Sequence, residues 1–133
     1  MERTLMLIKP DAVNRHLIGT ILSIVEREGF RIVNLKTDKM TKSKVILFYS
    51  IHKDKDFFKH LIEYMTSGVT VGVLLERINA IMYLRKIVGE TDPLMAEKGT
   101  IRHLYGETNR RNSVHASDSK KSFLHESKVF FKE

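Results

Sequence analysis

Apolar residues along the chain follow two spacings, which predict two kinds of element. Continuous or alternating apolar runs predict strands, and apolar residues three or four positions apart predict helices. Strands are expected at 4–8, 30–36, 70–75 and 127–131, and helices at 17–28, 41–49, 57–65, 78–88 and 119–125.

Particular residues mark where these elements begin and end. Pro10 cannot donate to a strand ladder, so it ends the first strand and turns the chain. Gly29 follows the first helix as a C-cap, and Thr41 precedes the second as a capping hydroxyl. The stretch 89–99 has no period and is expected to be a long ordered loop, and 100–112 is irregular and basic. The charged stretch 52–56 is expected to be a solvated turn.

The order of these elements is β-α-β-α-α-β-α-loop-α-β. It predicts an α/β fold of the α+β sandwich kind, ferredoxin-like, with a βαββαβ core and a four-stranded antiparallel sheet. We expect helices to cover the sheet on one face and the site to lie at loops beyond it. No internal repeat or linker interrupts the chain, so residues 1–133 are expected to form a single domain.

Composition narrows the function only partly. The chain carries 23 Lys and Arg against 16 Asp and Glu, a net charge of +7. This charge favours anionic ligands, but nucleic acids, nucleotide phosphates and acidic membranes are all anionic. No apolar run approaches the ~20 residues of a membrane span, and residues 1–4 begin a strand pattern rather than a signal peptide. The lack of cysteine excludes disulfides and thiolate zinc sites, and fits a reducing cytoplasm.

One histidine stands out because small, hydrogen-bonding residues surround it. Ala116 and Ser117 leave room around His115, and Ser117 and Asp118 can bond the ring or the backbone. A histidine fixed by its neighbours and left reachable suits nucleophilic catalysis through nitrogen. A histidine in a polar loop explains the same string, so the motif alone leaves both interpretations open.

Two cations are further candidates. Lys9 follows the first strand, at a position where residues often face a ligand, although a lysine whose stem lies along apolar surface fits equally. Arg85 falls at the edge of the buried face of the helix 78–88, within reach of a ligand.

Several motifs occur together in one order. They are Lys9-Pro10-Asp11, Tyr49, Phe57-Phe58, Gly-Glu-Thr-Asp-Pro at 89–93, Gly-Thr-Ile-Arg at 99–102 and Asn-Ser-Val-His-Ala-Ser-Asp-Ser at 112–119. At these spacings the chain resembles nucleoside diphosphate kinases over essentially its whole length. The string His-Ala-Ser-Asp-Ser with its upstream Asn-x-x-His is the most specific mark of the family.

The resemblance implies a magnesium-dependent ping-pong transfer that maintains NTP and dNTP pools. A nucleoside triphosphate, typically ATP, would give its γ-phosphate to His115, and a nucleoside diphosphate would then take it. By the same resemblance Glu126 holds the other ring nitrogen and Ser117 supports both residues. Tyr49 would lie near the histidine and orient Lys9 or a phosphate oxygen.

The other matching residues would bind the nucleotide. The resemblance places Lys9, Arg85, Thr91 and Arg102 at the phosphates, Asn112 with Lys9 at the ribose 3′-hydroxyl, and Phe57 against the base. Fixed cations and hydroxyls lower the barrier because the transition state spreads negative charge over peripheral oxygens. Mg²⁺ is expected to enter with the nucleotide phosphates rather than in a protein cage, since no carboxylate cluster suits a metal. A P-loop motif is also lacking.

The family pattern also implies a cytoplasmic homo-oligomer, with a hexamer favoured over a tetramer. Val69 and Lys98 stand where the family often has proline, Arg77 where glycine is usual, and Asp92 replaces a common asparagine. The first three changes concern turns and subunit contacts. The chain ends at Glu133, short of the C-terminal extension of longer members, which leaves the assembly open.

Two other classes of function compete with an active kinase. A nucleic-acid-binding module would use the net charge and aromatic residues among lysines, as at 57–59, and would be indifferent to His115. A catalytically silent homologue would require changes in the phosphate clamp, which consists of Lys9, Arg85, Thr91 and Arg102. These four residues and His115 are all present, which favours the kinase, with nucleic acid binding as a secondary activity.

Overall fold

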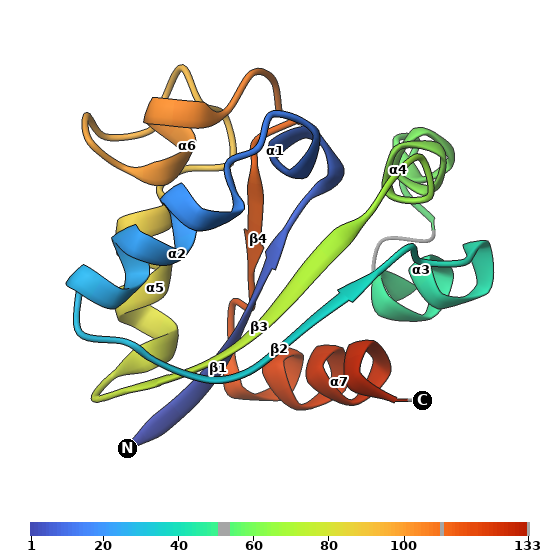
Figure 1. The fold of residues 1–133 in the computed structure, drawn as a ribbon. Coiled ribbons are helices and arrows are strands. Elements are labelled where there is room, and N and C mark those ends of the chain that lie inside the picture. Colours follow the sequence, from blue (N-terminus) through green and yellow to red (C-terminus); the bar gives the residue numbers. More distant parts are fainter. Residues whose placement is uncertain (51–53, 110, 133) are drawn as a thin grey trace.

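Among residues 1–50, 54–109 and 111–132, which the computed structural model describes, four strands form one antiparallel sheet (Figure 1). The strands are β1 (Glu2–Ile8), β2 (Arg31–Asp38), β3 (Thr70–Arg77) and β4 (Val114–Ala116). The helices are α1 (Pro10–Asn14), α2 (Ile18–Arg27), α3 (Lys42–Phe48), α4 (Phe58–Met65), α5 (Ala80–Val88), α6 (Ile101–Tyr105) and α7 (Lys120–Phe131). The strand order β2-β3-β1-β4 is that of the ferredoxin-like fold, which confirms the predicted fold class.

Helices cover both faces of the sheet (Figure 1). Met6 and Ile8 of β1 enter a core with α2 and α5, whereas Leu5 and Leu7 enter a second core with α3, α4 and α7. The expectation that helices cover one face only was therefore wrong. The uninterrupted apolar run of β1 is typical of a strand that is buried on both sides.

The end of the chain also differs from the prediction. Instead of a helix at 119–125 and a strand at 127–131, α7 continues without a break, and the fourth strand is the short β4. Helical spacing places Glu126 and Phe130 on the buried face of α7. Phe130 packs onto Gly72 of β3, where a Cβ atom would lie only 2.1 Å from the ring. Tertiary packing thus overrides the β propensity of the local sequence.

Two short helices were not predicted. Pro10 does end the ladder, but it then starts α1 as its first residue, because its fixed φ suits the first helical position. α6 lies inside the stretch expected to be irregular, and Thr100 caps it by accepting a bond from the backbone N–H of His103.

Other local expectations are confirmed. Thr41 caps α3 by accepting a bond from Lys44 N, Gly29 follows α2 at φ +88°, and 89–99 is a loop. The predicted charged turn at 52–56 lies partly outside the described residues, and its last three residues lie in a turn.

Two departures from the family pattern lie on the surface or in a side-chain stack. Val69 is exposed. Arg77 lays its guanidinium on the ring of Tyr83, 3.6 Å from the centroid, and donates to the carbonyl of Glu28. The stack gives the arginine a local packing role.

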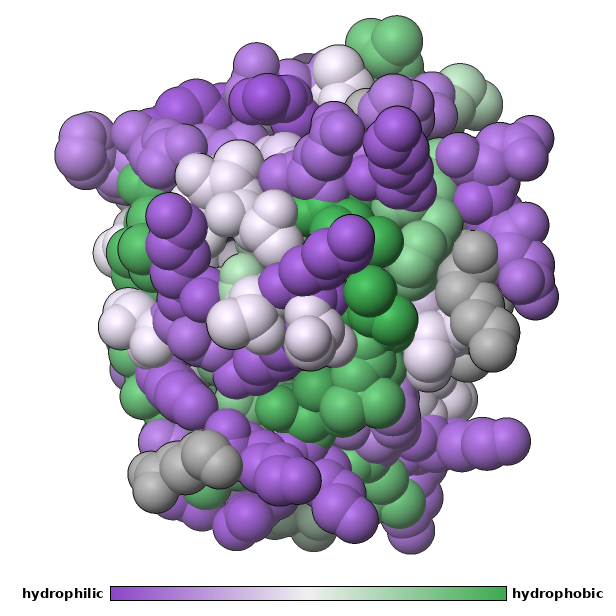
Figure 2. Space-filling model, turned by 90° about the vertical axis from the view of Figure 1, so that its right-hand side faces the viewer, coloured by the Kyte–Doolittle hydropathy of each residue, from purple (hydrophilic) through white to green (hydrophobic). Residues whose placement is uncertain are grey.

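The face that carries α3, α4 and α7 is mostly hydrophilic, with hydrophobic atoms gathered near its middle (Figure 2). α3 and α7 meet where Nε2 of His125 donates to the carbonyl of Leu47 at 2.9 Å. Within the described ranges no helix has the length and apolar character needed to cross a bilayer.

Candidate active site

The predicted site residues meet at one cavity of about 590 Å³. Its lining includes all of them except Ser117: Lys9, Tyr49, Phe57, Arg85, Thr91, Arg102, Asn112, His115 and Glu126. Ser117 is fully buried and reaches the cavity through a hydrogen bond to Glu126. Residues far apart in the sequence therefore form one site.

The fold explains how these residues come together. β4 pairs with β1 so that His115 stands opposite Leu7, two positions before Lys9 at the end of the strand. α5 supplies Arg85, α6 supplies Arg102 and α7 supplies Glu126. Because β1 and β4 are adjacent in the sheet, the lysine and the histidine open onto the same cavity.

His115 is held through one nitrogen of its ring. Its Nε2 lies 2.8 Å from Oε1 of Glu126, and the same oxygen accepts a hydrogen bond from Ser117 Oγ at 2.7 Å. Since a carboxylate only accepts, Nε2 carries the proton and the neutral ring keeps its lone pair on Nδ1. No hydrogen bond from the described residues engages that Nδ1.

Two aromatic rings confine the imidazole. Phe48 and Tyr49 contact it edge-on, with ring centroids 5.4 and 5.7 Å away. Burial, reinforced by the negative charge of Glu126, raises the pKa of Tyr49 well above its usual range, so its phenol stays neutral. The ring of His115 is therefore fixed by packing as well as by the carboxylate.

Arg102 is a buried cation with one donor unused. Its Nη1 and Nη2 donate to the carbonyls of Gly89 and Val114 at 3.0 and 2.9 Å, while Nε has no partner among the described residues. Burial, and then the charge of Arg85, lower the pKa of Arg102 to about 10, so it remains charged at neutral pH. Two neighbouring guanidinium groups in a cavity favour an anionic ligand, which would relieve their repulsion.

Lys9 and Asn112 form a second polar group in the cavity. Lys9 Nζ donates to Asn112 Oδ1 at 2.9 Å. The amide of Asn112 donates to the carbonyls of Thr91 and Asn109 at 2.9 and 3.0 Å. Asn112 thus joins the end of β1 to the loop 89–99.

Phe57 is half exposed at the start of α4, and it lines the cavity together with Leu61. An aromatic ring in this position offers a flat apolar surface to a planar ligand group.

Some lining residues of the cavity have no role predicted from the sequence. They are Phe48, Leu61, Asn109, Asp118 and Ser122. Asp118 was interpreted only as a partner for the ring or the start of a helix. A hydrogen bond from Ser122 lowers the pKa of the Asp118 carboxyl, so the cavity contains a carboxylate beside its cations. Asp118 belongs to the His-Ala-Ser-Asp string, and that place in the sequence was the available signal.

Across the described part of the chain, no three His, Cys, Asp or Glu side chains are grouped so as to hold a metal ion. The cations of the cavity suit phosphate oxygens instead.

Comparisons with known proteins agree with this chemistry. The family model described as nucleoside diphosphate kinase matches residues 2–133. A nucleoside diphosphate kinase of Persephonella marina is 48% identical over 131 residues, which is 98% of this chain and 94% of that protein. The solved structure of the Aquifex aeolicus enzyme has a TM-score of 0.95 at 40% identity, covering 98% of this chain and 95% of that one. The enzyme of Halobacterium salinarum, solved in complex with CDP, has a TM-score of 0.95 at 34% identity, covering 99% and 88%.

Proposed function

This chain belongs to the nucleoside diphosphate kinase family, and from that premise we propose how its own residues transfer a phosphoryl group. The family makes it a phosphotransferase that acts on nucleotides. We propose that His115 takes the γ-phosphoryl group of ATP and passes it to a second nucleoside diphosphate. One observation carries the proposal: Glu126 holds Nε2, which leaves Nδ1 as the nucleophile in a cavity lined by cations.

The proposed chemistry has two symmetrical steps. In the first, the lone pair of Nδ1 attacks the γ-phosphorus, the N–P bond forms, and the bond to the β-phosphate oxygen breaks to release ADP. In the second, a phosphate oxygen of the new diphosphate attacks the phosphorus and the N–P bond breaks. The ring gains positive character while it carries the phosphoryl group, and the carboxylate of Glu126 at 2.8 Å stabilises that state. No proton has to leave Nε2.

Arg85 and Arg102 would neutralise the charge on the transferred group. Both line the cavity with His115, and their guanidinium groups are donors for phosphate oxygens. Fixed donors aimed at developing charge lower the barrier without reorganisation. Thr91 adds a hydroxyl to the same cavity.

The ribose and the base would be bound by other residues of the cavity. We assign the ribose 3′-hydroxyl to Lys9 and Asn112, whose side chains lie 2.9 Å apart, and the base to the ring of Phe57. Stacking depends little on the identity of the base. This arrangement supports ATP, GTP and deoxynucleoside diphosphates as alternative substrates.

Magnesium would arrive as part of the nucleotide substrate, complexed by its phosphates. The described residues offer no carboxylate group to hold the ion by themselves, and the cationic lining of the cavity fits the phosphate oxygens.

We also propose that the protein forms a homo-oligomer, with a hexamer favoured over a tetramer. Exposed apolar side chains support a partner surface at α5 and the loop after it, namely Met82, Leu94 and Met95. Light scattering on the purified protein tests the number of subunits.

The test of the catalytic proposal is a nucleotide exchange assay on His115→Ala. We expect exchange between ATP and a second nucleoside diphosphate to be abolished, while the variant remains folded. His60→Ala is the matched control, because His60 is exposed on α4 and lies outside the cavity. Exchange by His115→Ala at the rate of the wild type would overturn the assignment.

A further inference from the structure

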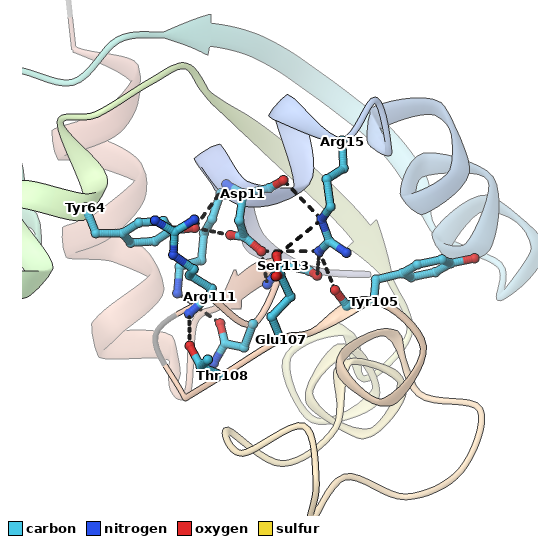
Figure 3. A network of polar contacts seen from close by, with 10 residues as sticks. Asp11, Arg15, Tyr64, Tyr105, Glu107, Thr108, Arg111 and Ser113 are labelled. Atoms are coloured by element: carbon cyan, nitrogen blue, oxygen red, sulfur yellow. Dashed lines mark hydrogen bonds and ion pairs between the residues drawn. The ribbon is translucent and has the colours of Figure 1, made fainter.

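Asp11 is a buried carboxylate that the proposed chemistry does not use. It lies in the first turn of α1, is 3% exposed, and is not part of the cavity lining. Figure 3 shows it at the centre of a network of polar contacts. A charge buried in this way is costly unless every contact is made, so its partners indicate what it holds in place.

The carboxylate joins three segments of the chain (Figure 3). Its Oδ1 accepts from the hydroxyl of Tyr64 on α4, and the backbone N–H of Asp11 donates back to that hydroxyl at 3.1 Å. Its Oδ2 accepts from the backbone N–H of Ser113 at 3.1 Å and from Arg15 at 3.4 Å. α1, α4 and the segment before β4 are thereby tied to one side chain.

Ser113 is the most constrained member of the network. Its φ of +76° lies in the left-handed region, which is unfavourable for serine. Both of its peptide groups are held by the start of α1 and the residue before it. Its N–H donates to Asp11, and its carbonyl accepts from the backbone N–H of Lys9 at 2.9 Å. This pair of bonds keeps a strained backbone in place.

Arg15 reinforces the same connection. It donates to the carbonyl of Tyr105 and to the hydroxyl of Ser113, and it lies 3.6 Å from Glu107. Burial, and then the hydrogen bond to Asp11, raise the pKa of Tyr64 well above its usual range, so its hydroxyl remains a donor.

The residues in the Asp11 network are close in sequence to the residues proposed to bind the ribose. Asn112 directly precedes Ser113, and Lys9 lies two positions before Asp11, with the rigid Pro10 between. Leu61, another lining residue of the cavity, lies on α4 one turn before Tyr64. Asp11 therefore ties together three segments that carry or adjoin lining residues.

We propose that Asp11 is a positioning residue for ribose recognition. It fixes Ser113 and α4 so that the side chains of Lys9 and Asn112 converge on the ribose 3′-hydroxyl. This inference rests on the proposed function, which assigns the hydroxyl to those two residues. A merely structural role would predict a different pattern, namely a loss that does not depend on the 3′-hydroxyl.

The experiment measures how fast a nucleoside diphosphate discharges the phosphoenzyme. Wild type and Asp11→Ala are phosphorylated with ATP and magnesium, isolated, and mixed with ADP or with 3′-deoxyadenosine diphosphate. We expect Asp11→Ala to be slower with ADP by about tenfold or more, as for the loss of charged hydrogen bonds. With the 3′-deoxy acceptor it should match the wild type within about twofold, because the group that Asp11 positions for is absent.

Two further variants keep the test decisive. Tyr64→Phe removes one hydroxyl and keeps the ring, so it answers the question if Asp11→Ala does not fold. Its discharge rate should depend on the 3′-hydroxyl in the same way, with a smaller decrease for ADP than in Asp11→Ala. Glu76→Gln is the control, because it also neutralises a carboxylate in an ion-pair network, at the far end of β3. It should discharge at wild-type rates with both acceptors.

Equal losses with both acceptors, or no loss with ADP, in Asp11→Ala or in Tyr64→Phe would overturn the positioning role. The same 3′-hydroxyl dependence in Glu76→Gln would overturn it too. Failure of the proposed function gives a different result, since wild-type protein would then form no phosphoenzyme to discharge.

Discussion

Oε1 of Glu126 lies 2.8 Å from Nε2 of His115 and accepts a second hydrogen bond from Ser117 at 2.7 Å. A residue of α7 thus engages one ring nitrogen of a β4 histidine, while no hydrogen bond from the described residues engages the other. The carboxylate is nearly buried, at 9% exposed, so little water competes for it. The orientation of the ring depends on this contact.

Glu126→Gln removes the negative charge while keeping the shape of the side chain. We expect exchange to fall on the order of tenfold to a hundredfold, because a charged hydrogen bond to the ring is replaced by a neutral one. Steady-state kinetics with ATP and a second nucleoside diphosphate measure the exchange rate. Glu63→Gln, on the exposed side of α4, is the matched control. Wild-type rates in Glu126→Gln would exclude a role for the carboxylate.

Arg102→Ala should lower turnover by about a hundredfold, since a fixed donor to the transferred group is lost. The variant also loses bonds to two backbone carbonyls, so thermal unfolding must be measured beside the kinetics. Arg102→Lys keeps the charge but not the planar fork, and should recover only part of the rate. A loss of turnover that follows the loss of folded protein alone would remove Arg102 from the phosphate clamp.

Gly72→Ala tests how α7 packs against β3. The new Cβ would lie 2.1 Å from the ring of Phe130, so the ring has to move, and we expect α7 and Glu126 to move with it. We expect the free energy of unfolding to fall by about 1–3 kcal/mol and exchange to fall with it. Adding Phe130→Leu should restore part of both, as measured by denaturant unfolding and by kinetics. A fully stable and active Gly72→Ala variant would contradict this packing.

Glu76 provides a dependence of stability on pH. Arg31, and then Arg3, hold the pKa of its carboxyl below its ordinary value of 4.5. A carboxyl whose pKa is lower in the folded state adds stability that is complete above the unfolded pKa and is lost as pH falls through the folded one. The Tm difference between wild type and Glu76→Gln should therefore be constant above about pH 5 and shrink in more acidic buffer. An equal difference at all pH values would contradict the ion pairs.

The sequence predicted the parts of the fold that depend on local signals. The apolar run of β1, the Thr41 cap and the left-handed Gly29 need only neighbouring residues. The stretch 127–131 was misassigned as a strand because its composition is β-like. Its helical structure depends on a distant contact, the packing of Phe130 on Gly72. β4 was missed because three residues are too short for a period to be visible.

The site was predicted from motif order, and the structure brings those residues to one cavity. The sequence did not reveal the supports behind it. Asp11 stood in a recognised motif, yet its partners Tyr64 and Ser113 lie 53 and 102 positions away. Phe48 was assigned to a helix, and only the fold turns it against the ring of His115. Contacts of this range are set by tertiary structure.

His115 is the residue proposed to carry the phosphoryl group between the two nucleotides. The most direct test is to incubate the protein with ATP and magnesium and to measure the mass of the intact chain under non-acidic conditions. We predict one added phosphoryl group that is labile to acid, is discharged by a second nucleoside diphosphate, and is absent from His115→Ala. Binding of ATP without any added mass, or an equally phosphorylated His115→Ala, would contradict the account.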